Sequence, residues 1–87
     1  MGSKTFYGVR FSAYADDHLP AHVNGRYAET EVLVELLSGG KVIQSGRNDA
    51  VRPVDAKRSE VRRILSIAAL HAAELHGIWE KVHGSAS

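Results

Sequence analysis

The chain has 87 residues, 44% of them hydrophobic and 24% charged, with no cysteine and a net charge of +1. This length predicts one domain with a thin core, and the hydrophobic share argues against a disordered chain. Because cysteine is absent, disulfide bonds and thiolate metal ligands are excluded. No apolar run approaches the roughly 18 residues of a membrane span, so we expect a cytoplasmic protein with no membrane partner.

The first half of the chain has the side-chain alternation of β-strands. Residues 6–14 alternate aromatic or β-branched side chains with small or polar ones, and strands are also expected over 21–28, 31–37 and 41–45. The two glycines within residues 38–40 predict a hairpin turn. Because each connection is short, the simplest arrangement is an antiparallel meander of about four strands.

After residue 53 the apolar spacing changes to steps of three and four, which predicts one amphipathic helix over residues 56–83. At about 1.5 Å per residue it would be about 42 Å long, so we expect it to overhang, bend or break, with Gly77 as its weakest point. The predicted fold is therefore α+β, a meander packed against one long C-terminal helix. We expect a single domain over residues 1–87, with a core of about 6–82 and frayed termini.

The predicted core lies between the sheet and the helix. Its members are Val9, Phe11, Val32, Val34, Leu36, Ile64, Leu65, Ala68, Leu75 and Trp79. One helix covers only one face of a sheet, so the opposite face would expose Tyr14, Leu33 and Leu37, and Leu70 would point away from the helix's apolar arc. Apolar surface left over on a small domain indicates association with another protein or with a second copy.

The densest chemistry lies in the run Asp16-Asp17-His18-Leu19-Pro20-Ala21-His22. Its two histidines and one of its carboxylates would form a ligand set that suits zinc or iron(II), and His18 with Asp17 could act as an acid–base pair. Pro20 keeps the run extended, so the two imidazoles would converge only across a sharp turn. In the alternative interpretation the carboxylates bind turn backbone and the loop recognises a partner. We expect no cofactor, with a divalent metal as the alternative.

The run from Tyr14 to His22, followed by Gly25-Arg26-Tyr27, resembles a family of small bacterial proteins known only as a domain of unknown function. Members carry an acidic-His-x-Pro-x-His segment, a β-meander and a C-terminal helix, and the resemblance covers about residues 6–82. Their genes often lie beside a second small gene, as in toxin–antitoxin pairs, which implies a protein partner. The family has a further histidine where this chain has Asn24, so an implied histidine site lacks one member here.

Three other histidines lie in the predicted helix. We expect His71, inside the apolar arc, to be a core residue with one ring nitrogen hydrogen-bonded. In the alternative, it faces His22 and supplies the nitrogen that Asn24 does not. We expect His76 and His83 to be solvated.

Basic residues gather in residues 47–63, where six Lys or Arg stand against three Asp or Glu, for +3. Those at the helix start could contact phosphates or an acidic partner, or they could simply solvate that helix. No aromatic platform accompanies them, so we expect nucleic acid to bind only through non-specific phosphate contacts.

Together these features predict a small prokaryotic protein-interaction module, a component of a toxin–antitoxin-like pair, whose partner is another small protein or a second copy. The residues expected to bind the partner are Asp16, Asp17, His18, His22, Arg58, Arg62 and Arg63. One alternative is a metal-assisted or acid–base enzyme. Its catalytic candidates are Asp17, His18 and His22, and its metal-ligand candidates are Asp16, His18 and His22. The other alternative is a phage or plasmid inhibitor of a host defence complex. We favour a protein without enzymatic activity, because no cysteine or serine nucleophile is signalled.

Overall fold

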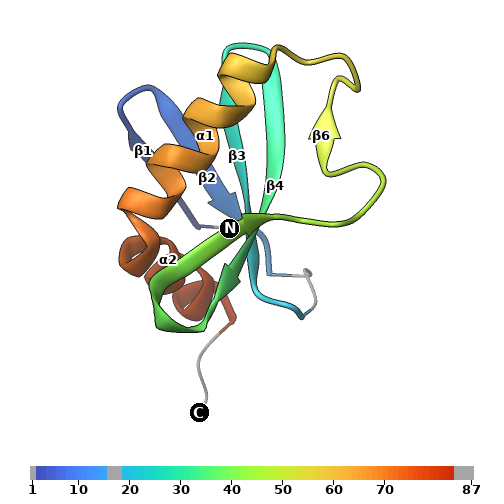
Figure 1. The fold of residues 1–87 in the computed structure, drawn as a ribbon. Coiled ribbons are helices and arrows are strands. Elements are labelled where there is room, and N and C mark those ends of the chain that lie inside the picture. Colours follow the sequence, from blue (N-terminus) through green and yellow to red (C-terminus); the bar gives the residue numbers. More distant parts are fainter. Residues whose placement is uncertain (1, 16–18, 84–87) are drawn as a thin grey trace.

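The structure is a computed structural model that describes residues 2–15 and 19–83. Its strands are β1 (Gly2–Phe6), β2 (Val9–Ala13), β3 (His22–Tyr27), β4 (Thr30–Leu37), β5 (Lys41–Gln44) and β6 (Val51–Arg52). A 3₁₀ turn (Ser38–Gly40) precedes β5, and the chain ends in α1 (Arg58–Leu70) and α2 (Ala72–His83). The first five strands form an antiparallel meander, β6 pairs with β4, and both helices cover one face of the sheet (Figure 1). The predicted α+β class is confirmed, but the structure adds two strands and divides the helix.

The first added strand is β1. One strand was predicted over residues 6–14, but the chain turns within this range, and β1 and β2 form a hairpin. Tyr7 and Gly8 have φ values of 52° and 84° and form a two-residue turn that pairs Phe6 with Val9. Such turns favour Asn-Gly, whereas an aromatic residue is typical of a strand, so the turn was missed. β1 also begins at Gly2, where a frayed terminus was expected.

The core lies between the sheet and the helices, as predicted. Every predicted core residue is buried except Leu65, which is half-buried and packs against the cluster. Gly25 allows this close packing, because a Cβ there would lie 2.6 Å from Ile64 Cγ2 and 2.9 Å from Phe11 Cε1. A side chain at position 25 would therefore push α1 away from β3.

The helix breaks at His71, so the prediction of one long helix weakest at Gly77 is wrong. His71 has φ −116° and ψ 29°, and its N–H donates to the Ile67 carbonyl oxygen at 3.1 Å to close α1. The His71 carbonyl then accepts from the N–H of Leu75 at 3.0 Å, within the first turn of α2. The break lets α1 contact β3, β4 and β5 while α2 contacts mainly β1 and β2 and, to a lesser extent, β3 and β4, so both helices bury their apolar sides. None of the helices in residues 2–15 and 19–83 is long and apolar enough to span a membrane.

The segment between β5 and β6 is attached to β4 at both ends. The Leu33 carbonyl accepts from the Ser45 N–H at 2.9 Å, and the Leu33 N–H donates to the Ala50 carbonyl at 2.7 Å. Ser45 and Ala50 are buried, whereas Arg47 and Asp49 between them are exposed. The loop therefore leaves the sheet edge and partly covers Leu33, which the sequence analysis expected to be exposed.

Candidate functional site

The predicted histidine–aspartate loop lies mostly outside the described residues. Asp16, Asp17 and His18 belong to the part that is not described, so their predicted catalytic, metal and partner-binding roles stay predictions. His22 begins β3 and is 8% exposed. Its Nδ1 lies 2.9 Å from the Pro20 carbonyl oxygen, so Nδ1 carries the hydrogen. Among the residues that the structure describes, no three His, Cys, Asp or Glu side chains form a metal-binding group.

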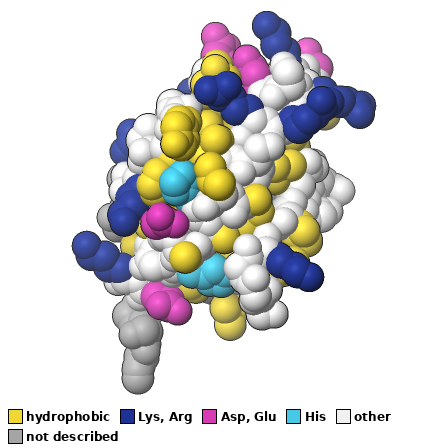
Figure 2. All heavy atoms as spheres, turned by 60° about the vertical axis from the view of Figure 1, so that its left-hand side comes forward, with side chains coloured by type: hydrophobic (Ala, Val, Ile, Leu, Met, Phe, Trp, Pro, Cys, Tyr) yellow, Lys and Arg dark blue, Asp and Glu magenta, His cyan; other side chains and the backbone are white. Residues whose placement is uncertain are grey.

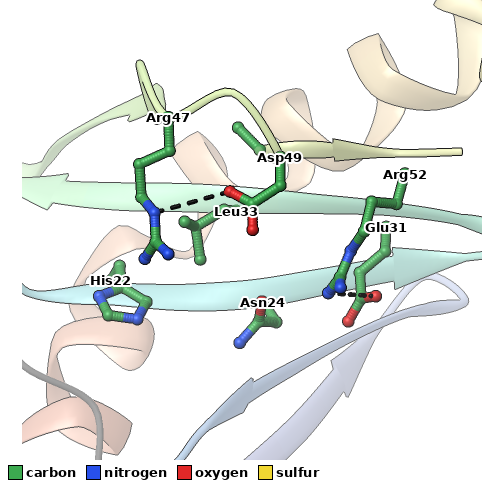
Figure 3. A pocket seen from close by; sticks show the side chains of 8 residues that line it. His22, Asn24, Glu31, Leu33, Arg47, Asp49 and Arg52 are labelled. Atoms are coloured by element: carbon green, nitrogen blue, oxygen red, sulfur yellow. Dashed lines mark hydrogen bonds and ion pairs between the residues drawn. The ribbon is translucent and has the colours of Figure 1, made fainter. Parts of the chain in front are cut away.

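His22 lines a pocket of about 140 Å³ on the sheet face opposite the helices, which we call the open face (Figure 3). The lining residues are His22, Asn24, Glu31, Leu33, Arg47, Asp49, Ala50 and Arg52. Arg52 Nη2 donates to Glu31 Oε1 at 3.0 Å, and Arg47 Nε lies 3.6 Å from Asp49 Oδ1. Each arginine of this pocket thus has its own carboxylate, so its walls are balanced in charge.

A row of charged residues crosses the open face beside this pocket. The register pairs Arg10 with Arg26, Arg26 with Glu31, and Glu31 with Arg52. The sequence alone does not reveal this row, because its members come together only when the strands pair. Alternation within each strand would have shown only that they share a face.

A second hollow, of about 490 Å³, lies over α1 and the turn between β1 and β2; we call it the α1 groove. It is lined by Tyr7, Ser59, Arg62, Arg63, Ser66, Ile67 and Leu70. Tyr7 and Leu70 are 67% and 68% exposed although both are large apolar side chains. In Figure 2, hydrophobic side chains gather on the face toward the viewer, with Lys and Arg side chains above and beside them.

The predicted basic partner-binding residues Arg58, Arg62 and Arg63 are all exposed on α1. Arg62 and Arg63 line the α1 groove, whereas Arg58 does not. The Arg63 guanidinium carbon also lies 4.7 Å from the centroid of the Tyr27 ring, a cation–π contact that orients the side chain. The structure thus places two of the three arginines beside exposed apolar surface.

The histidine at the helix break has an unusual environment. The His71 ring stacks on Phe6 at a centroid distance of 3.9 Å and an interplanar angle of 9°. Neither of its buried ring nitrogens has a hydrogen-bond partner, so the prediction that one ring nitrogen of His71 is hydrogen-bonded is wrong. Glu74 Oε2 lies 3.5 Å from Nδ1, a distance that allows charge attraction if the ring is protonated, but the geometry is not that of a hydrogen bond.

The other histidines occupy separate places. The His22 ring lies 5.3 Å from the Trp79 ring, whereas the His71 ring stacks on Phe6 and lies near Glu74. His76 Nε2 bonds the Leu37 carbonyl at 3.1 Å, and His83 Nδ1 bonds the Trp79 carbonyl at 3.1 Å. Both are half-buried, so the expectation that they are solvated is wrong.

Comparison of the chain with protein-family models, with curated proteins and with solved structures found no match.

Proposed function

We propose that the chain is a small protein-interaction module that docks an acidic amphipathic segment of another protein in the α1 groove. The observation that carries the proposal is the exposure of Tyr7 and Leu70, at 67% and 68%, in one groove bordered by arginines. Exposed apolar surface with a polar rim is typical of protein-binding sites, and Tyr and Arg are enriched among the residues that dominate binding energy.

Charge complementarity selects the occupant. Arg62 and Arg63 line the groove, and none of the described residues that line it is acidic. An apolar side chain of the partner would pack between Tyr7 and Leu70 while its carboxylates pair with the two guanidinium groups. The arginine stems would extend the apolar contact, because long basic side chains carry hydrocarbon as well as charge.

The backbone of Tyr7 supports the same proposal. Its φ of 52° lies in the left-handed region, which costs a residue with a side chain roughly 1–2 kcal/mol. With the aromatic rings of the described residues, the Tyr7 ring makes one contact, a tilted one with His71 at a centroid distance of 6.0 Å. A strained and exposed aromatic residue is explained if a partner covers it.

The prokaryotic setting and the toxin–antitoxin-like pairing are part of this proposal, and they rest on the resemblance described above. The acidic loop from Asp16 to His22 stays a predicted second contact. The enzymatic alternative and the defence-inhibitor alternative have no observation in residues 2–15 and 19–83 that favours them.

The test is a nuclear magnetic resonance titration with a helical peptide that carries leucines on one face and glutamates beside them. We expect shifts at Tyr7, Leu70 and Arg62, and a loss of at least tenfold in affinity when glutamine replaces the peptide glutamates. Tyr7→Asn should weaken binding comparably while raising stability, because asparagine tolerates the left-handed turn. Ile43→Ser, which removes an exposed apolar side chain on β5, is the matched control and should leave affinity unchanged.

Two results would contradict this proposal. Peptide binding that survives both Tyr7→Asn and Leu70→Ser would place the contact elsewhere. Concentration-dependent dimerisation of the free protein that Leu70→Ser abolishes, seen by sedimentation, would show that a second copy occupies the groove instead.

A further inference from the structure

We propose that the open face carries a second binding site, in which Arg10 and Arg26 hold a single phosphomonoester group. The site lies on the sheet face opposite the helices, so it is separate from the α1 groove and does not depend on the function proposed for that groove. It adjoins the charge-balanced pocket of Figure 3 and shares Asn24 and Glu31 with it.

The site is a block of four residues on two neighbouring strands. The register pairs Arg10 of β2 with Arg26 of β3, and Ser12 of β2 with Asn24 of β3. Alternation along each strand brings all four side chains to the open face, where they line a hollow of about 210 Å³ together with Tyr14 and Glu31. Two guanidinium groups, a hydroxyl and an amide all offer hydrogen-bond donors, which is the set that an oxyanion requires.

The described part of the chain leaves the two cations without an ion pair. Like charges directly opposite each other on neighbouring strands destabilise a sheet. Glu31 faces Arg26 in the register, but its Oε1 accepts from Arg52 at 3.0 Å. Among the described residues, neither Arg10 nor Arg26 has an ion-pair partner. A bound anion would remove this repulsion, so the arrangement is costly when empty and favourable when filled.

Ser12 adds a hydroxyl to the same hollow. It lies on the face that no helix covers, yet the residue is only 8% exposed. It lines the hollow together with Arg10 and Arg26, so its hydroxyl can donate to an oxygen of a ligand that the two arginines hold.

The charge distribution favours one phosphoryl group over a carboxylate or a nucleic acid. A phosphomonoester near neutral pH carries close to two negative charges and so matches two arginines, whereas a carboxylate matches one. A nucleic-acid backbone would need a continuous basic track. The row instead meets Glu31 on β4, and Glu35 lies four residues further along that strand, on the same face. The whole chain carries only +1.

The experiment is a titration of the full chain at constant ionic strength, followed through the backbone amides of Ser12 and Asn24. The probes are inorganic phosphate, a phosphoserine peptide, acetate and a dinucleotide phosphodiester. We expect saturable one-site binding of the first two and weak, unsaturated responses to the others. A peptide that binds tighter than phosphate would identify a phosphoprotein as the source of the group, and equal binding would identify a small phosphorylated molecule.

Arg26→Gln should lower phosphate affinity at least tenfold, because charge-assisted hydrogen bonds are lost. Arg58→Gln is the matched control: it removes the same charge from α1, far along the chain from this site, and should change affinity less than twofold. Without phosphate, Arg26→Gln should not lower the melting temperature, since it relieves the repulsion with Arg10. Equal losses in both variants, or equal binding of acetate and phosphate, would show only general charge attraction and would overturn the proposal.

Discussion

Gly25 is the position at which a single added methyl group should disturb the packing of α1 on the sheet. In Gly25→Ala the new Cβ would lie 2.6 Å from Ile64 Cγ2 and 2.9 Å from Phe11 Cε1, where ordinary carbon contacts are about 3.5–4.0 Å. Ile64 and Phe11 are both fully buried, so neither can move aside into solvent. Overpacking of this kind costs about 1–3 kcal/mol, or about 4–24 °C of melting temperature in a domain of this size.

Thermal and urea denaturation of Gly25→Ala would measure this loss against Gly77→Ala. Gly77 lies inside α2 with no atom within 4 Å of an added Cβ, so alanine there should raise stability by up to about 1 kcal/mol. Ile64→Leu removes the Cγ2 methyl group that the new Cβ meets, so it should cost less in the Gly25→Ala background than alone. A Gly25→Ala protein as stable as the parent, with no coupling to position 64, would refute the close approach of α1 to β3.

Two further predictions concern the helix break. His71→Phe should keep the stack on Phe6 and remove two buried ring nitrogens without partners, so we expect the free energy of unfolding at pH 8 to rise by about 1 kcal/mol. The control is His76→Phe, which loses the hydrogen bond to the Leu37 carbonyl and should therefore lower the free energy of unfolding. A loss of stability in His71→Phe would show that its ring nitrogens have partners in solution. Hydrogen bonding to its own backbone N–H, aided by His71 and Lys4, lowers the pKa of Glu74 below its usual 4.5. Because the folded-state pKa is the lower one, Glu74 stabilises the fold above pH 4.5 and loses this effect as pH falls through the lowered pKa. Glu74→Gln should therefore be less stable than the parent at neutral pH, and the difference should disappear once Glu74 is protonated in the folded protein. A difference between the two proteins that persists at low pH would contradict this linkage.

The periodicity of the sequence determined the fold class and most of the core. A period of two in the first half and of 3.6 in the second predicts which residues face inward, because each backbone geometry presents its side chains at that interval. Val9, Phe11, Val32, Val34 and Ile64 are buried for this reason. Local pattern also identified the exposed arginines of α1, since they lie off the apolar arc of the helix.

Contacts between distant segments decided the rest. Local propensity favours a strand at Tyr7 and a weak point at Gly77. The chain instead turns at Tyr7, and the helix breaks at His71, whose ring stacks on Phe6. In the described part of the chain, only α1 has extensive contacts with β5, and only α2 has them with β1 and β2. The loop before β6 is held through the backbone of Leu33, whose hydrogen bonds leave no mark in side-chain type. The opposition of Arg10 and Arg26 depends on the register of β2 against β3. A slip of one residue would send one of the two to the other face of the sheet, and only the buried side chains of the whole core fix that register.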